Sequence, residues 1–93
     1  MRKQMIRKMR KEIMRLTHGK PPVARVLNRD DDGKLYPKKE WGCCLEVAVN
    51  GYRICAPDDN WYEAYKACLD CARLAATWEP FKPIENNETT VRI

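Results

Sequence analysis

Serine is absent from this 93-residue sequence, and histidine occurs only once, at His18. The lack of serine excludes Ser-His-Asp hydrolysis by composition. A Cys-His nucleophile would have to use His18, but this residue precedes Gly19 and stands close to Pro21 and Pro22, in a connection where a lone histidine is typically a solvated loop residue. We therefore predict that the protein is not an enzyme and has no catalytic residues.

Glycine and long apolar runs are also scarce. The four glycines are scattered along the chain and form no phosphate-binding loop. No apolar run exceeds three residues and 33% of the residues are charged, which excludes a membrane span. The basic N-terminus is not followed by the continuous apolar stretch of a signal peptide. We expect a cytoplasmic protein with no membrane partner.

The length of the chain limits its organisation. A chain of 93 residues can bury one modest core, which makes a second domain or a large enzyme cleft improbable. We predict one domain over residues 1–80 and a proline-containing tail over residues 81–93.

The basic charge is concentrated at one end of the chain, whose net charge is +5. Residues 1–20 carry eight basic side chains and one acidic, whereas residues 21–93 carry ten basic and twelve acidic. The sequence thus predicts an acidic body with a basic N-terminal segment, and a polyanion would be attracted to that segment.

The five cysteines are odd in number and lack the regular spacing of a secreted disulfide scaffold, which indicates a reducing compartment. Cys68 and Cys71 have the spacing of half a zinc site, and Cys43, Cys44 or Cys55 could supply the rest. Adjacent residues of a strand point to opposite faces, however, and a second C-x-x-C is missing. We predict free thiols with no metal and no cofactor, and a zinc-stabilised module is an alternative.

Residues 2–17 have the periodicity of an amphipathic helix. At about 100° per residue, its apolar side chains fall in one stripe. The members of this stripe are Met5, Ile6, Met9, Ile13 and Leu16. The opposite side carries the cations Lys3, Arg7, Lys8, Arg10, Lys11 and Arg15. His18-Gly19 and the two prolines that follow are expected to end the helix.

Three strands are expected next. Residues 23–29 are the first, and a turn at residues 30–33 follows it. Residues 43–49 and 52–56 flank Asn50-Gly51, which favours the type I′ turn of a two-residue hairpin. This turn would place Val49 opposite Tyr52 and Val47 opposite Ile54, on the face that becomes the core.

A second helix is predicted from about Trp61 to Trp78, where Asn60 and Glu63 fit a capping box. The fold class is therefore α+β, in the order α-β-β-β-α, with both helices on one face of an antiparallel sheet. Residues 89–93 either add a fourth strand at the edge of the sheet or stay outside it.

This order, together with the Asn50-Gly51 turn and the alanine-rich second helix, resembles the double-stranded-RNA-binding domain. That family grips phosphates with a Lys-Lys-x-Ala-Lys run at the start of its last helix. The matching positions here, residues 58–63, read Asp-Asp-Asn-Trp-Tyr-Glu and would repel phosphate. The resemblance therefore implies the fold but not that family's mode of binding RNA.

We predict a small binding protein that docks on nucleic acid or a nucleoprotein complex through the six cations of the first helix. In its size and split charge, the chain resembles small accessory proteins of phages and mobile elements, including the anti-CRISPR proteins that obstruct host defence complexes. The alternative is an inhibitor directed only at a host protein, with an acidic contact surface formed by Asp58, Asp59, Glu63 and the turn at residues 30–32.

Overall fold

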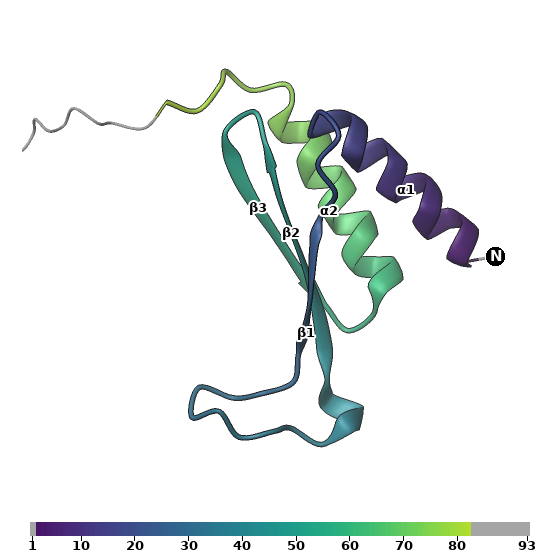
Figure 1. Cartoon of the computed structure of the whole chain (residues 1–93), viewed down its shortest axis with the longest axis vertical. Coiled ribbons are helices and arrows are strands. Elements are labelled where there is room, and N and C mark those ends of the chain that lie inside the picture. The colour runs from purple at the N-terminus through teal and green to yellow at the C-terminus, as the bar shows by residue number, and fades with distance from the viewer. Residues whose placement is uncertain (1, 83–93) are drawn as a thin grey trace, which may run out of the picture.

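The computed structural model describes residues 2–82, in which two helices pack on one face of a three-stranded antiparallel sheet (Figure 1). The elements are α1 (Arg2–Leu16), β1 (Val23–Leu27), the 3-10 helix η1 (Lys38–Glu40), β2 (Gly42–Val49), β3 (Tyr52–Asp58) and α2 (Trp61–Ala75). The α+β class and the order α-β-β-β-α are as predicted.

Helix α1 ends through a left-handed C-cap. His18 and Gly19 have φ angles of 60° and 96°, and the Gly19 N–H donates to the Met14 carbonyl at 2.6 Å. This bond satisfies a carbonyl that the last turn of the helix leaves without a partner. The helix therefore ends at Leu16, one residue before the predicted end at Thr17.

The β2–β3 hairpin has the predicted register. Asn50 and Gly51 both have positive φ angles, 57° and 84°, as a type I′ turn requires. Val49 pairs with Tyr52 and Val47 with Ile54. Alternate residues of both strands then face the helices, and the others face the uncovered side of the sheet.

Strand β1 pairs with β2 on one side only and lies at the edge of the sheet, whose strand order is β1-β2-β3. It ends at Leu27 rather than at the predicted Arg29, because the chain bends into a separate small hairpin in which Arg29 bridges to Leu35. All five residues of β1 are exposed, since α2 packs on β2 and β3 and α1 packs on α2.

Helix α2 begins with the predicted cap, because the Asn60 side chain accepts a hydrogen bond from the Glu63 N–H at 2.9 Å. The prediction that it continues to Trp78 was wrong, since the last helical residue is Ala75. Beyond that point the Trp78 ring makes an edge-to-face contact with Tyr52 at 4.9 Å between centroids. The chain leaves the helix through a turn in which the N–H groups of Thr77 and Trp78 donate to the carbonyls of Leu74 and Ala75.

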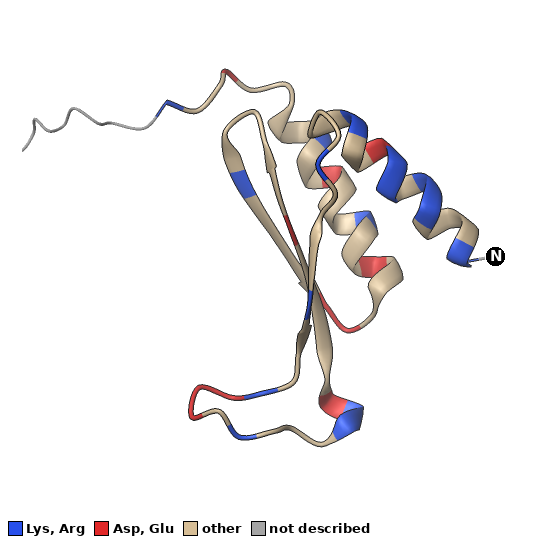
Figure 2. Cartoon of the chain, viewed as in Figure 1, with Lys and Arg blue, Asp and Glu red and all other residues tan. Residues whose placement is uncertain are grey.

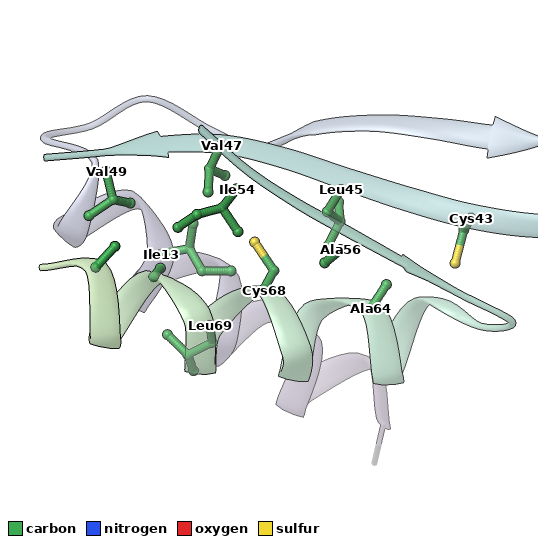
Figure 3. Close-up of a cluster of buried hydrophobic side chains, with 12 residues drawn as sticks. Ile13, Cys43, Leu45, Val47, Val49, Ile54, Ala56, Ala64, Cys68 and Leu69 are labelled. Atoms are coloured by element: carbon green, nitrogen blue, oxygen red, sulfur yellow. The ribbon is translucent and has the colours of Figure 1, made fainter. Parts of the chain in front are cut away.

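The core lies between the sheet and the two helices (Figure 3). Strands β2 and β3 point their buried side chains at α2, and α1 contributes Ile13, the only residue of that helix that is buried. The buried apolar residues are Ile13, Cys43, Leu45, Val47, Val49, Ile54, Ala56, Ala64, Cys68, Leu69, Ala72 and Ala75.

The predicted apolar stripe of α1 is correct except at its margin. Met9 and Leu16 pack against the core beside Ile13, but Met5 is 46% exposed. Met5 lies about 80° around the helix from Ile13 at 100° per residue, so it points past the contact with the body.

The segment after α2 contacts the β2–β3 hairpin near its turn. Phe81 donates its N–H to the Asn50 carbonyl at 3.0 Å, and its ring contacts Tyr52 with centroids 5.5 Å apart. The predicted tail or edge strand at residues 89–93 lies outside the described residues.

Val47→Ala is expected to lower the free energy of unfolding by about 1–3 kcal/mol, because Val47 is buried against the helices and its truncation leaves a cavity. Denaturant titration measures this change. The control is Ala48→Thr on the exposed face of the same strand, which should change stability by no more than about 0.5 kcal/mol. Equal effects of the two substitutions would contradict the observed register.

Candidate functional site

The six predicted cations of α1 form one exposed surface, which we call the basic face (Figure 2). Its members are Lys3, Arg7, Lys8, Arg10, Lys11 and Arg15. All six are exposed in the structure, as the helical periodicity predicts.

Burial of the opposite side holds the basic face in position. Ile13 is 0% exposed, and Met9 and Leu16 pack beside it. The helix can therefore stay docked while its cations contact a partner. Binding to a membrane surface, or to a protein that recognises the apolar side of a helix, would instead require this side of α1 to leave the core together with Ile13.

The basic face is extended rather than concave. Lys3 and Arg15 are twelve residues apart, which corresponds to about 18 Å along the axis, and the six cations cover an arc of about 160°. Lys8, Lys11 and Arg15, together with Glu12, line a shallow hollow of about 360 Å³. Three cations thus face one common space, which is larger than a phosphate group.

Glu12, the acidic residue of α1, forms two ion pairs at the border of the basic face. Its carboxylate accepts hydrogen bonds from Arg15 at 2.5 Å and from Arg73 of α2 at 3.4 Å. Arg15 is therefore partly neutralised, and Arg73 adds a cation beside the basic face. Helical periodicity cannot reveal Arg73, because only the packing of α2 against α1 brings it there.

Arg2 lies at the start of α1 outside the predicted set. Its guanidinium stands over the Tyr62 ring of α2, 4.9 Å from the ring centroid. A cation over an aromatic face is attracted by the negative electrostatic potential of the ring. This contact ties the N-terminal end of α1 to α2, so the basic face is held at both ends.

The alternative acidic surface is divided in two. Asp58 is the last residue of β3 and Asp59 follows it. Both line a hollow of about 510 Å³ together with Glu40, Arg29 and other residues of the β1–β2 connection. Glu63 lies in the first turn of α2. These carboxylates can receive a cationic side chain, but Arg29 contributes positive charge to the same hollow.

The acidic turn at residues 30–32 is not part of that hollow. Figure 2 shows this acidic turn within the β1–β2 connection, well apart from the loop between β3 and α2. The Asp30 carboxylate accepts the backbone N–H groups of Asp32 at 2.9 Å and Lys34 at 2.8 Å. Asp30 therefore stabilises the turn, and the structure does not join the predicted acidic contacts into one surface.

The alternative of a zinc site finds no geometric support. Cys68 is buried in the core, whereas Cys71 on the same helix is exposed, so the two thiols of the half-site differ in their access to solvent. Within residues 2–82, no three Cys, His, Asp or Glu side chains are gathered as metal ligands would be. Burial raises the pKa of the Cys68 thiol to about 11, and burial also raises the pKa of Cys43. Both thiols thus resist forming the thiolate that binds metal.

Alkaline pH should destabilise the protein through Cys68. The pKa of this thiol rises from 9.0 to about 11 on folding, so the unfolded chain loses its proton first. The stabilisation is complete below pH 9 and is lost between pH 9 and 11, by roughly 2–3 kcal/mol. Denaturant titrations at several pH values measure this slope, and Cys68→Ala should make it shallower. An unchanged slope in Cys68→Ala would contradict the assignment.

No family model, curated protein or solved structure matches this chain. Neither helix of the described part combines the length and apolarity needed to cross a membrane.

Proposed function

We propose that this protein is a non-catalytic binding protein whose basic face docks on nucleic acid or on a complex that contains it. One observation carries the proposal: the six cations are exposed together on a helix whose opposite side is fixed in the core by Ile13. Binding through this surface therefore requires no unfolding and no detachment of α1.

The ion-pairing pattern supports a polyanionic partner. Within residues 2–82, Arg15 is the member of the basic face that has a carboxylate partner, and the other five have none. Solubility does not require five uncompensated cations on one short helix, because mixed charges solvate a surface equally well. Their combined field attracts a chain of phosphates, which releases its own counterions on binding.

The proposed mode differs from that of the double-stranded-RNA-binding domain. In this protein the start of α2 carries Asp59 and Glu63 near its first turn, where that family carries lysines. Phosphates are repelled from this position and attracted to α1. The exposed side of α1 is also narrow enough for the DNA major groove, about 12 Å wide, where its arc of cations would reach phosphates on both walls.

Fluorescence anisotropy with labelled DNA and RNA duplexes tests this function directly. If the five free cations each contact a phosphate, the logarithm of the affinity should fall with the logarithm of salt concentration at a slope of about −4 to −5. A slope near zero, or no binding to either duplex at low salt, would contradict the proposal.

The same proposal includes an accessory or inhibitory role in a host nucleoprotein complex, of the kind that phage proteins play. A pull-down from a host lysate, with one arm treated with nuclease, distinguishes binding through nucleic acid from direct binding to a host protein. Capture that is lost on nuclease treatment indicates nucleic acid as the bridge. If capture survives nuclease and depends on Asp58 and Asp59 rather than on the basic face, the protein-directed inhibitor replaces our proposal.

A further inference from the structure

Strand β1 is an edge that lacks the usual protection against pairing with another strand. Edge strands are commonly guarded by proline, by lysine or by a covering helix or loop. Residues Val23–Leu27 contain no proline or lysine, and neither helix covers them, because α2 packs on β2 and β3 while α1 packs on α2. Within residues 2–82, no strand pairs with the outer side of β1.

The side chains of β1 are apolar and exposed on both faces. Val26 is aligned with Cys43 and Ala24 with Leu45, so both lie on the helix side of the sheet, where Val26 remains 51% exposed. Val23 and Leu27 lie on the open side and are 57% and 41% exposed. A further strand at this edge would cover apolar surface on both faces.

The one charge of β1 is already compensated. Arg25 donates to the Glu46 carboxylate at 2.5 Å, and Arg53 of β3 donates to the same carboxylate. The hydrogen bond from Arg53 holds the pKa of Glu46 below its usual range, so the carboxylate stays ionised at neutral pH. The pairing with Glu46 therefore reduces the charge that this edge presents to a charged peptide, and Arg25 is the one residue of β1 whose charge would repel an identical edge.

We propose that β1 pairs antiparallel with β1 of a second copy of this chain, which gives a dimer with one continuous six-stranded sheet. In the register centred on Arg25, Val23 lies opposite Leu27 of the second copy and Ala24 lies opposite Val26. Every cross-strand pair except the central one is then apolar, and such pairs stabilise adjacent strands. A two-fold axis normal to the sheet keeps both helix layers on the same side.

This self-complementarity is what favours a second copy over another partner. The opposite edge of the sheet does not offer it, because β3 contains Pro57, which has no N–H to donate. One pair of five-residue strands is a small contact compared with the roughly 1,200 Å² of a stable interface. The dimer is therefore weak, reversible and favoured by high protein concentration.

Sedimentation equilibrium of the full chain over a concentration series tests the proposal. The samples are treated with nuclease and kept in high salt, so that bridging through the basic face is suppressed. The average mass should rise with concentration from 10.9 kDa toward twice that value. A mass that stays at the monomer value at all concentrations would overturn the proposal.

Two variants with the same charge change locate the contact. Val26→Lys places a charge on the proposed edge and should weaken association at least tenfold. Leu74→Lys changes an apolar residue of α2 that is 57% exposed, and it should leave association unchanged. Equal weakening by both would show general association of apolar surface and would contradict pairing through β1. Thermal unfolding confirms that each variant remains folded.

The register has its own test. In the proposed dimer the two Arg25 side chains lie opposite each other, and like charges in this position weaken pairing. Arg25→Val should therefore tighten association a few-fold. Unchanged or weaker association in Arg25→Val would contradict the register centred on Arg25.

Discussion

Ile13→Ala is expected to lower the free energy of unfolding by about 2–5 kcal/mol, the largest loss from any single truncation in α1. Ile13 is fully buried and is one of the four largest side chains with that degree of burial. It is also the only buried residue of its helix, so its removal opens a cavity where α1, α2 and the sheet meet. For a domain of this size, such a loss is a large share of the total stability.

Met5→Ala is the matched control for this experiment. Met5 lies on the same helix and within the predicted apolar stripe, but it is 46% exposed, so its truncation should cost less than about 1 kcal/mol. Denaturant titration followed by circular dichroism gives both values. Equal losses in the two variants would show that α1 is not anchored through Ile13.

Local chemistry is the reason that much of the fold could be predicted. Asn50-Gly51 determines the turn and hence the register of both flanking strands, because few other residue pairs adopt positive φ angles at low cost. Asn60 similarly determines the start of α2 through its side-chain cap. Each of these signals acts within a few residues and does not depend on the rest of the chain.

Features that depend on packing were not predictable. The composition of residues 23–27 indicates a strand but does not reveal that the helices leave it uncovered. Helix α2 ends at Ala75, and just beyond it Trp78 contacts Tyr52, a residue far away in the sequence. Hydrophobic periodicity alone would extend the helix to Trp78.

In the candidate site too, features set by local sequence were predictable and features set by packing were not. Periodicity was enough to place the six cations on one side of α1, since exposure follows from the position of the apolar stripe. The sequence did not indicate that Glu12 binds both Arg15 and Arg73. It also suggested one acidic surface, whereas the structure places the turn at residues 30–32 apart from Asp58 and Asp59.

Reversal of three cations of the basic face is expected to weaken polyanion binding by about two orders of magnitude or more. The variant is Arg7→Glu, Lys8→Glu and Lys11→Glu, which removes three phosphate contacts and adds three repulsions. These side chains are exposed and lie outside the apolar stripe, so the fold should persist. The salt slope of any remaining binding should become shallower by about three units.

Arg15 is kept in this variant for a structural reason. It is hydrogen-bonded to Glu12, so Arg15→Glu would set two carboxylates side by side and disturb the link from Glu12 to Arg73. A loss of binding could then reflect a change in how α1 packs on α2. The chosen residues have no ion-pair partner within the described part of the chain.

The most direct test of the account is the affinity of this variant for a labelled nucleic-acid duplex at low salt, measured beside a control with the same change in charge. The control is Lys34→Glu, Lys38→Glu and Lys39→Glu, three exposed cations of the β1–β2 connection, and both variants shift the net charge from +5 to −1. We predict that reversal on α1 weakens binding by about two orders of magnitude or more and that the control retains most of it, apart from a uniform loss due to net charge. Equal loss in the two variants, or intact binding after reversal on α1, would contradict the assignment of the basic face as the binding surface.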